Sequence, residues 1–256
     1  MECCTRQLIR GLLALLVLLL IQSCSPNIST DLQQKQENAD EQDVSESSHS
    51  TEVATRLREG IDVSEYSGAV DWAAVVKGGY SFAFVKATEG VDLKDSSFDD
   101  HWYAMKRAGI IRGAYHFYVT EDDPHEQAAF FIKTVVLEPG DLAPVVDVEL
   151  IGHGTSPGLP QRLKTWLELV EKHYRVKPII YTNAKFWNEH FNSTFSDYPL
   201  WIAEYDVDAP KLPAGWSAWR FWQWRGDAGV PGVEKGADLN RVNREGLDLS
   251  NLVISK

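Results

Sequence analysis

The chain has 256 residues, of which 44% are hydrophobic and nine are tryptophan, so it can form one large domain with a substantial core and is not a disordered protein. Its net charge of −12, without a Lys/Arg cluster, argues against a nucleic-acid partner, because phosphate binding needs a concentrated basic face. About half of this charge is local, since seven acids and one lysine between Ser25 and Thr55 give that segment a charge of −6.

The N-terminus has the pattern of an export signal. Two arginines precede an apolar stretch from Leu12 to Ile21, which is shorter than the ~20 residues that span a bilayer. The stretch ends in IQSC at residues 21–24, which resembles the lipobox of bacterial lipoproteins. This resemblance implies a signal peptide over residues 1–23 and a lipid anchor on Cys24. A plain secretory peptide or a short membrane anchor is the alternative.

Residues 24–58 are rich in Ser, Gln, Glu, Asp and Asn. Such a composition cannot bury enough apolar surface to offset its ordering entropy, so we expect a flexible acidic tether. Cys3 and Cys4 precede the expected cleavage point, and the mature chain would therefore have no disulfide and no cysteine-based metal site. The expected product is an exported lipoprotein, held at a periplasmic or cell-surface membrane face, with its folded domain at residues 59–256.

From Gly60 onward, short β-rich runs alternate with helical stretches. Helices are predicted at 70–77, 99–108, 124–136 and 159–174, and strands at 60–64, 82–88, 110–118, 143–149, 178–183, 199–205, 220–225 and 237–242. This alternation favours a parallel sheet, and eight strands suggest closure into a barrel. The connections 206–215 and 226–236 are rich in Pro and Gly and show no helix. The predicted fold class is therefore α/β, an irregular (β/α) TIM-like barrel whose last strands lack regular helices.

The run APVVDVEL, residues 143–150, places two acids in an apolar strand. Side chains alternate along a strand, so Asp147 and Glu149 point the same way, at the C-terminal mouth of the barrel. Two carboxylates in a partly apolar mouth cannot both ionise easily, so one becomes a proton donor at neutral pH, as cleavage of a glycosidic bond requires. The alternative is a structural pair that Arg or Lys neutralises inside the barrel.

Two further acids occupy matching places. Asp62 lies in the first strand and Asp238 starts the last strand, and these two strands are neighbours in a closed barrel. Either residue alone is more typical of a turn or cap. Four carboxylates at one mouth would indicate a function.

Eight motifs, in this order along the chain, resemble the family 25 glycoside hydrolases, the Chalaropsis-type lysozymes: GIDVSEY, FVKATEG, GAYHFY, PVVDVE, IIYTN, LWIAEY, WQW and ADLN. The resemblance spans about Gly60 to Val253. It implies an irregular (β/α) barrel that hydrolyses the β-1,4 bond between N-acetylmuramic acid and N-acetylglucosamine in the glycan strands of peptidoglycan.

The resemblance also implies roles for the acids. Glu149 matches the general acid/base, Asp147 the adjacent carboxylate, and Asp62 and Asp238 the other acids of the catalytic site. An Asp nucleophile, the substrate's acetamido group and direct attack by water all remain open. The ~6.5 to 7 Å that separates the Asp147 and Glu149 α-carbons along a strand does not decide between retaining and inverting chemistry.

Three aromatic residues near strand ends, Tyr115, Tyr181 and Trp201, are predicted to bind sugar by stacking and hydrogen bonding, although such rings also serve as core. His116 is expected in the core. No cofactor and no metal are expected, and we expect a monomer.

Two alternative functions remain. A family 18 chitinase also ends a strand in D-x-E, but that family has further Asp residues where this chain has Ala143 and Val145. The second alternative is a barrel that binds the cell wall but has lost catalysis, although the retention of all four acids argues against it.

Overall fold

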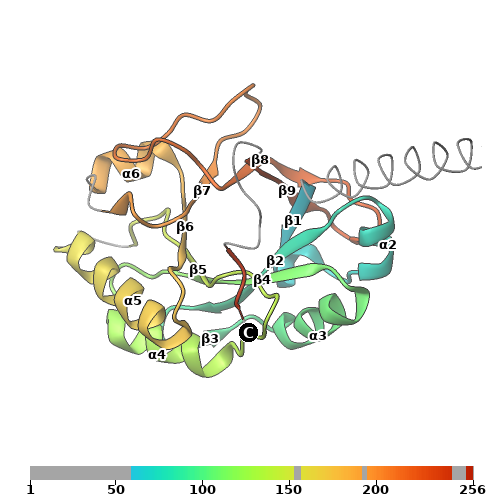
Figure 1. Ribbon diagram of the computed structural model, residues 1–256, viewed down its shortest axis with the longest axis horizontal. Helices are drawn as coiled ribbons and strands as arrows, with labels where there is room; N and C mark the ends of the chain where they lie inside the picture. Colours follow the sequence, from blue (N-terminus) through green and yellow to red (C-terminus); the bar gives the residue numbers. More distant parts are fainter. Residues whose placement is uncertain (1–58, 153–156, 192–194, 244–251, 256) are drawn as a thin grey trace, which may run out of the picture. The chain divides into compact units, whose positions relative to one another are not determined.

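The structure is a computed structural model that describes residues 59–152, 157–191, 195–243 and 252–255 (Figure 1). All of them belong to one compact unit of the chain, His49–Lys256. The expected signal peptide, Cys24 and the tether lie outside the described residues, so the division of the chain at residues 24 and 59 stays a prediction. In the described part of the chain, no helix has the length and apolar character needed to cross a membrane.

Within the described residues, eight strands close into a barrel. They are β1 (Glu59–Val63), β2 (Phe82–Glu89), β4 (Ile111–Phe117), β5 (Val145–Asp147), β6 (Ile179–Thr182), β7 (Leu200–Ala203), β8 (Phe221–Ala228) and β9 (Ala237–Val242). Their order is β1-β9-β8-β7-β6-β5-β4-β2, and pairing of β1 with β2 completes the circle. The short β3 (Leu93–Lys94) pairs antiparallel with the end of β2. The predicted α/β barrel of eight strands is confirmed.

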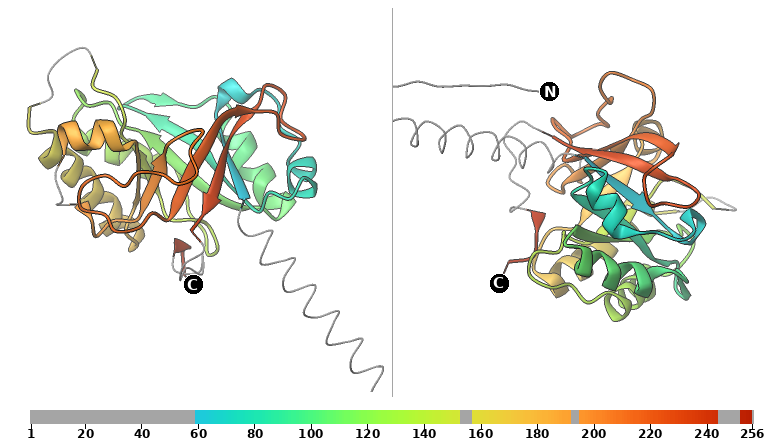
Figure 2. Two further views of the ribbon diagram at one scale, coloured as in Figure 1. Left: turned by 90° about the horizontal axis from the view of Figure 1, so that it is seen from above. Right: turned by 90° about the vertical axis from the view of Figure 1, so that its right-hand side faces the viewer.

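The direction of the last strand differs from the expected parallel sheet. Strand β9 is antiparallel to both of its neighbours, β8 and β1. Residues 229–236, which connect β8 to β9, are too few for the crossover that a parallel strand would need. The start of β9 therefore lies where β1 ends, and Figure 2 shows β8 and β9, in orange and red, beside the blue β1.

Five α-helices are described: α2 (Trp72–Lys77), α3 (Phe98–Ala108), α4 (Pro124–Thr134), α5 (Leu159–Tyr174) and α6 (Ala184–His190), besides the 3-10 turn η1 (Glu65–Ser67). The first four confirm the predicted helices. The seven-residue α6 was not predicted; Asn183 caps its start, and its own Phe186 and Trp187 are buried. In Figure 1 the helices lie around the side of the barrel that holds β1 to β7, and among the described residues no helix follows β7 or β8.

Alternation along the strands gives the barrel two apolar layers. On β2, Phe82 and Phe84 point inward, whereas Ala83 and Val85 face the surrounding helices. The inward cluster is built from Phe82, Phe84, Leu142, Ala143, Val145, Ile179, Tyr181, Trp201, Phe221, Val242 and Leu252. Gly113 fits this packing because a Cβ there would lie 2.4 Å from the Phe84 ring. The inner cluster forms an apolar floor beneath the mouth.

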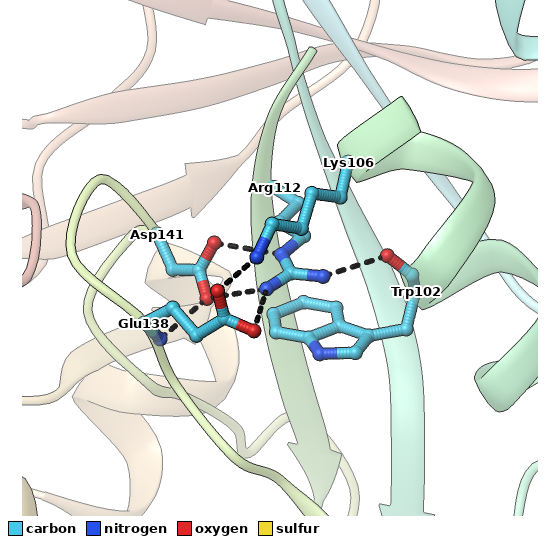
Figure 3. Close-up of polar contacts among 5 residues, drawn as sticks. All are labelled: Trp102, Lys106, Arg112, Glu138 and Asp141. Carbon is cyan, nitrogen blue, oxygen red and sulfur yellow. Dashed lines mark hydrogen bonds and ion pairs between the residues drawn. The ribbon is translucent and has the colours of Figure 1, made fainter. Parts of the chain in front are cut away.

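A buried charged cluster lies at the opposite end of the barrel, where β4 begins (Figure 3). Arg112 is 2% exposed and forms two hydrogen bonds with Asp141, of 2.7 and 3.0 Å. Its third donor reaches the carbonyl oxygen of Trp102 at 2.8 Å, and the guanidinium lies 4.0 Å from the Trp102 ring centre. Asp141 also accepts the Glu138 amide proton. We call Trp102, Lys106, Arg112, Glu138 and Asp141 the base cluster.

Candidate active site

A cavity of about 190 Å³ opens at the mouth of the barrel. All seven site residues proposed from the sequence line it: Asp62, Tyr115, Asp147, Glu149, Tyr181, Trp201 and Asp238. Five further residues, Ser64, Tyr66, Lys86, Phe117 and Gln223, complete its wall. A second cavity of about 220 Å³ shares Asp62, Ser64, Tyr66, Tyr115 and Asp238 with the first. The cleft therefore continues from β5 across β1 to the start of β9.

Asp147 and Glu149 occupy different environments. Strand β5 ends at Asp147, two residues earlier than predicted, so Glu149 follows the strand rather than ending it. Asp147 is 7% exposed, and its Oδ1 has no hydrogen-bond partner among the described residues, whereas Glu149 is partly exposed. Burial, followed by the charge of Glu149, raises the pKa of Asp147 well above its usual value. Burial and the charge of Asp238 raise the pKa of Glu149.

Asp62 and Asp238 face each other across the strand pair β1–β9, where their α-carbons are register partners. Burial, followed by the charge of Asp238, raises the pKa of Asp62 to about 8. Burial also raises the pKa of Asp238, whose Oδ1 accepts the Asp227 amide proton at 2.9 Å. Four carboxylates with raised pKa values thus share one mouth.

Lys86 is the cation that lines the first cavity. Its ammonium group pairs with Glu89 at 2.6 Å, and Glu89 is not one of the four acids. The charge of Lys86 lowers the pKa of Asp147, but burial and the charges of Glu149 and Asp62 raise it by more. Within the described residues, none of the four acids forms an ion pair with Arg or Lys. The sequence left open that Asp147 and Glu149 form a structural pair neutralised by Arg or Lys inside the barrel. This geometry does not fit that alternative.

Two side chains that the sequence did not single out connect the acids. Gln223 on β8 donates to Asp62 Oδ2 at 2.8 Å and to Asp238 Oδ2 at 3.1 Å. Asn240 on β9 donates to Asp62 Oδ2 at 2.7 Å. Both amides are buried, and they are register partners on neighbouring strands. Each of them is a polar residue at an inward position of an apolar strand, which is the feature that could have identified them from the sequence. Asn240 lies two residues after Asp238 and therefore on the same face of its strand.

The predicted aromatic residues differ in exposure. Trp201 is 2% exposed, stacks on Phe84 with ring centres 4.3 Å apart, and donates its indole proton to Asn240 at 2.8 Å. Tyr181 is 7% exposed and donates to Gln223, whereas Tyr115 is partly exposed. The contacts of Trp201 are those of a structural residue, and sugar binding by these three residues stays a prediction.

Two exposed tyrosines near the mouth were missed. Tyr66, 75% exposed, lines both cavities, and its signal was its place in the motif GIDVSEY. Tyr205, 45% exposed, lies two residues after β7 and donates its hydroxyl proton to Gln223 Oε1 at 2.6 Å. Exposed rings at a cleft are better placed than buried ones to stack on a pyranose face.

His116 is fully buried, as expected of a core residue. Its ring nitrogens lie 2.8 Å from the Thr88 hydroxyl and 3.0 Å from Gln127 Oε1. Burial lowers the pKa of His116 to about 4, so the ring is neutral at physiological pH. Among the described residues, no group of three or more His, Cys, Asp or Glu has a geometry that could hold a metal ion.

Comparison with known proteins places this geometry in a family. The model of the family described as "Glycosyl hydrolases family 25" matches residues 61–233 of this chain. The Escherichia coli K12 protein YegX is 38% identical over 189 residues, which cover 72% of this chain and 69% of YegX. Lysozyme M1 of Streptomyces globisporus is 34% identical, over 72% of this chain and 67% of that protein.

Solved structures agree. The bacterial lysozyme from Streptomyces coelicolor superposes with a TM-score of 0.73 at 30% identity, covering 77% of this chain and 97% of that one. The family match covers more than half of the chain, and the ordered motifs noted above lie largely within it. The chain belongs to glycosyl hydrolase family 25.

Proposed function

We propose that the protein is a muramidase that hydrolyses the β-1,4 bond between N-acetylmuramic acid and N-acetylglucosamine in peptidoglycan. The observation that carries the proposal is the set of four carboxylates, with raised pKa values, at the mouth of a family 25 barrel. The names of its relatives, lysozyme and muramidase, support the substrate class.

Glu149 is proposed as the general acid. It follows the end of β5 and is partly exposed, so a glycosidic oxygen in the cleft can approach its carboxyl group. Its raised pKa favours the protonated form, which is the form that donates a proton to the leaving oxygen. Once deprotonated, the same group can take a proton from water.

The other three acids are proposed to orient the sugar and, in their ionised forms, to stabilise positive charge on it. Cleavage passes through an oxocarbenium-like state, which a neighbouring carboxylate stabilises. Asp147 lies two residues from Glu149 and has a buried oxygen without a described partner, so it is suited to this role. Asp62 and Asp238 form the opposite wall, where the two amides hold them in place.

Replacement of Glu149 tests the proposal. Glu149→Gln keeps the shape of the side chain but cannot donate the proton, so release of reducing ends from purified peptidoglycan should fall by about 10²- to 10⁴-fold. Glu168→Gln, an exposed site on α5, is the matched control. Mass spectrometry of the wild-type products should show muramic acid at the reducing end. N-acetylglucosamine there would identify a glucosaminidase, and the absence of cleavage would favour a wall-binding barrel.

We further propose that the protein acts as a monomeric lipoprotein anchored through Cys24, with Asp62, Asp147 and Asp238 as the remaining catalytic residues and Tyr115, Tyr181 and Trp201 contributing to the sugar site. The IQSC sequence after an apolar stretch supports the anchor. Mass spectrometry of the N-terminal peptide should show diacylglycerol on Cys24, and Cys24→Ser should release the protein from the membrane fraction. An unmodified cysteine would contradict the anchor.

A further inference from the structure

Tyr66 is an exposed ring on a short turn at the edge of the cleft. It lies on η1, four residues after Asp62 of β1. Its side chain is 75% exposed, and no large hydrophobic residue in the described part of the chain is more exposed. An aromatic ring that stays in water at a cleft offers its apolar face to a ligand.

Tyr66 stands where the two cavities of the cleft join, since it lines both of them. The first cavity contains Asp147 and Glu149, whereas the second extends to Lys235 and to Ala237 at the start of β9. A linear glycan whose cleaved bond lies beside the two acids of the first cavity would place a further sugar unit in the second. Such a chain would pass the Tyr66 ring.

Hydrogen bonds within the turn fix the backbone at this ring. Ser64 Oγ accepts the Tyr66 amide proton at 3.3 Å, and Ser67 Oγ accepts the Ser64 amide proton at 3.4 Å, which together form a capping box. The Ser67 amide also donates to the Ser64 carbonyl oxygen at 2.9 Å. The turn is therefore closed on itself.

Asp95 holds the start of the turn from the loop between β3 and α3. This carboxyl group is 2% exposed, and its Oδ2 accepts the Glu65 amide proton at 3.0 Å. Its Oδ1 accepts the amide and hydroxyl protons of Ser97, at 3.0 and 2.6 Å. The Ser96 hydroxyl adds a hydrogen bond to Glu65 Oε2 at 2.6 Å. A buried carboxyl group thus links the turn to the loop before α3.

The connection between β8 and β9 holds the other side of the turn. The Lys235 amide donates to the Ser67 carbonyl oxygen at 3.1 Å, and Glu234 exchanges two hydrogen bonds with Ala69, of 3.0 and 2.9 Å. Gly68 has a φ of +72°, and a Cβ there would lie 2.6 Å from Glu234 Oε2. The turn that carries the exposed ring is therefore tied to two separate loops.

We propose that Tyr66 is a substrate-binding residue that stacks on a pyranose unit of the glycan at the junction of the two cavities, and that Asp95 is the positioning residue that holds it there. This inference rests on the proposed muramidase activity and adds a contact outside the set of four acids. A ring that is fixed before binding loses little conformational entropy when a sugar stacks on it. Because stacking stabilises the bound substrate and the transition state alike, its loss appears in KM and not in kcat.

Replacement of Tyr66 tests the stacking. With soluble glycan fragments, prepared from peptidoglycan by removal of its stem peptides, Tyr66→Ala should raise KM by about 10-fold and leave kcat unchanged. Tyr66→Phe keeps the ring and should retain the wild-type KM. Tyr103→Ala, at a 62% exposed tyrosine of α3 outside both cavities, is the matched control and should not alter KM. An unchanged KM in Tyr66→Ala, or a Tyr66→Phe variant as weak as Tyr66→Ala, would overturn the stacking.

Fragment length tests the place of the ring. A fragment too short to enter the second cavity makes less use of its junction with the first. The rise in KM for Tyr66→Ala should therefore be larger on long fragments than on the shortest fragment that the wild type cleaves. An equal rise at every length would contradict a contact at the junction.

Asp95→Asn tests the positioning role. The amide keeps the shape of the carboxyl group but turns an N–H toward either Glu65 or Ser97, so the link between the turn and the loop weakens. KM should rise by about 2- to 10-fold, the size expected for one hydrogen bond, with kcat unchanged. This rise should vanish in the Tyr66→Ala background, because the effect passes through that ring.

A milder variant keeps this test decisive if Asp95→Asn does not fold. Ser96→Ala removes only the exposed hydrogen bond to Glu65 and should give a smaller rise in KM, which should also vanish in the Tyr66→Ala background. A fall in melting temperature with a wild-type KM, or an equal rise in both backgrounds, would show that these contacts serve the fold alone.

These outcomes are separate from failure of the proposed function. Wild-type protein that releases no muramic acid reducing ends would refute the muramidase activity. Active wild-type protein with an inactive Glu149→Gln variant, but with the same KM in Tyr66→Ala as in the wild type, would refute only the role of Tyr66.

Discussion

The two ends of the barrel hold charged groups in opposite ways. In the base cluster, Arg112 donates hydrogen bonds to Asp141 and to the carbonyl oxygen of Trp102, and its guanidinium plane lies over the Trp102 ring. At the mouth, four acids lie together without an Arg or Lys ion pair among the described residues. Burial is similar at both ends, since Asp141 is 6% and Asp147 is 7% exposed.

The two ends differ in whether a cation compensates the desolvation cost of the buried carboxylates. A buried carboxylate that meets a bidentate guanidinium recovers much of its desolvation cost, whereas one surrounded by other carboxylates does not and shifts its pKa instead. We therefore assign the base cluster to the fold and the mouth to chemistry. Substitutions at the two ends should affect stability and activity in opposite ways.

The largest effect is expected for Asp147→Asn. Loss of this carboxyl group should lower kcat by at least about 10²-fold, comparable to loss of an acid–base group. The melting temperature should stay unchanged or rise, because the variant removes a buried carboxylate from three like-charged neighbours. Kinetics on purified peptidoglycan and thermal unfolding measure the two effects. A fall in both would place Asp147 with the structural charges.

Asp141→Asn should show the reverse. Arg112 would keep its charge in a buried site without its main partner, which costs about 3 to 5 kcal/mol of folding free energy. Below its melting temperature the variant should retain wild-type kcat. Denaturant unfolding gives the free energy, and Arg112→Met combined with Asp141→Leu is the control, since removal of both charges should cost less than removal of one. A stable single variant would contradict this assignment.

The pH dependence of stability should sharpen the comparison. The pKa of Asp62 is about 8 in the folded protein against 3.8 as its ordinary value, so the folded state binds this proton more tightly than the unfolded state. Its contribution is fully present below about pH 4 and is lost as the pH rises toward and through 8. Asp62→Asn should flatten the fall in melting temperature between these values. An unchanged slope would show that this carboxylate is not the source.

The smallest effect is expected for Glu138→Gln. Glu138 pairs with Lys106 at the edge of the base cluster, where both side chains are about half exposed and solvent screens the pair. Its 3.6 Å contact with Arg112 is longer than the two bonds from Arg112 to Asp141. The melting temperature should stay close to that of the wild type, and activity should be unaltered. A loss comparable to that of Asp141→Asn would mean that the rim of the cluster is as important as its centre.

The strengths and gaps of the sequence prediction have definite physical causes. The apolar strand at 143–149 and the helical face of Leu163, Trp166, Leu167 and Val170 follow from local periodicity, and the face is buried as expected. The helix α6 was missed because its seven residues are too few to show a clear helical periodicity of apolar residues. The direction of β9 was missed although the connection at 229–236 is short, which is the signal for a hairpin.

The sequence by itself determined which strands carry acids and that these strands form a barrel, because both follow from residue type and local periodicity. Only the tertiary structure decided that Asp238 lies opposite Asp62, that Asp147 is buried while Glu149 reaches the cleft, and that the Trp201 indole donates to Asn240. These features depend on strand direction, depth and the aim of individual donors. Such properties arise between segments far apart in the chain, and no local pattern of residues specifies them.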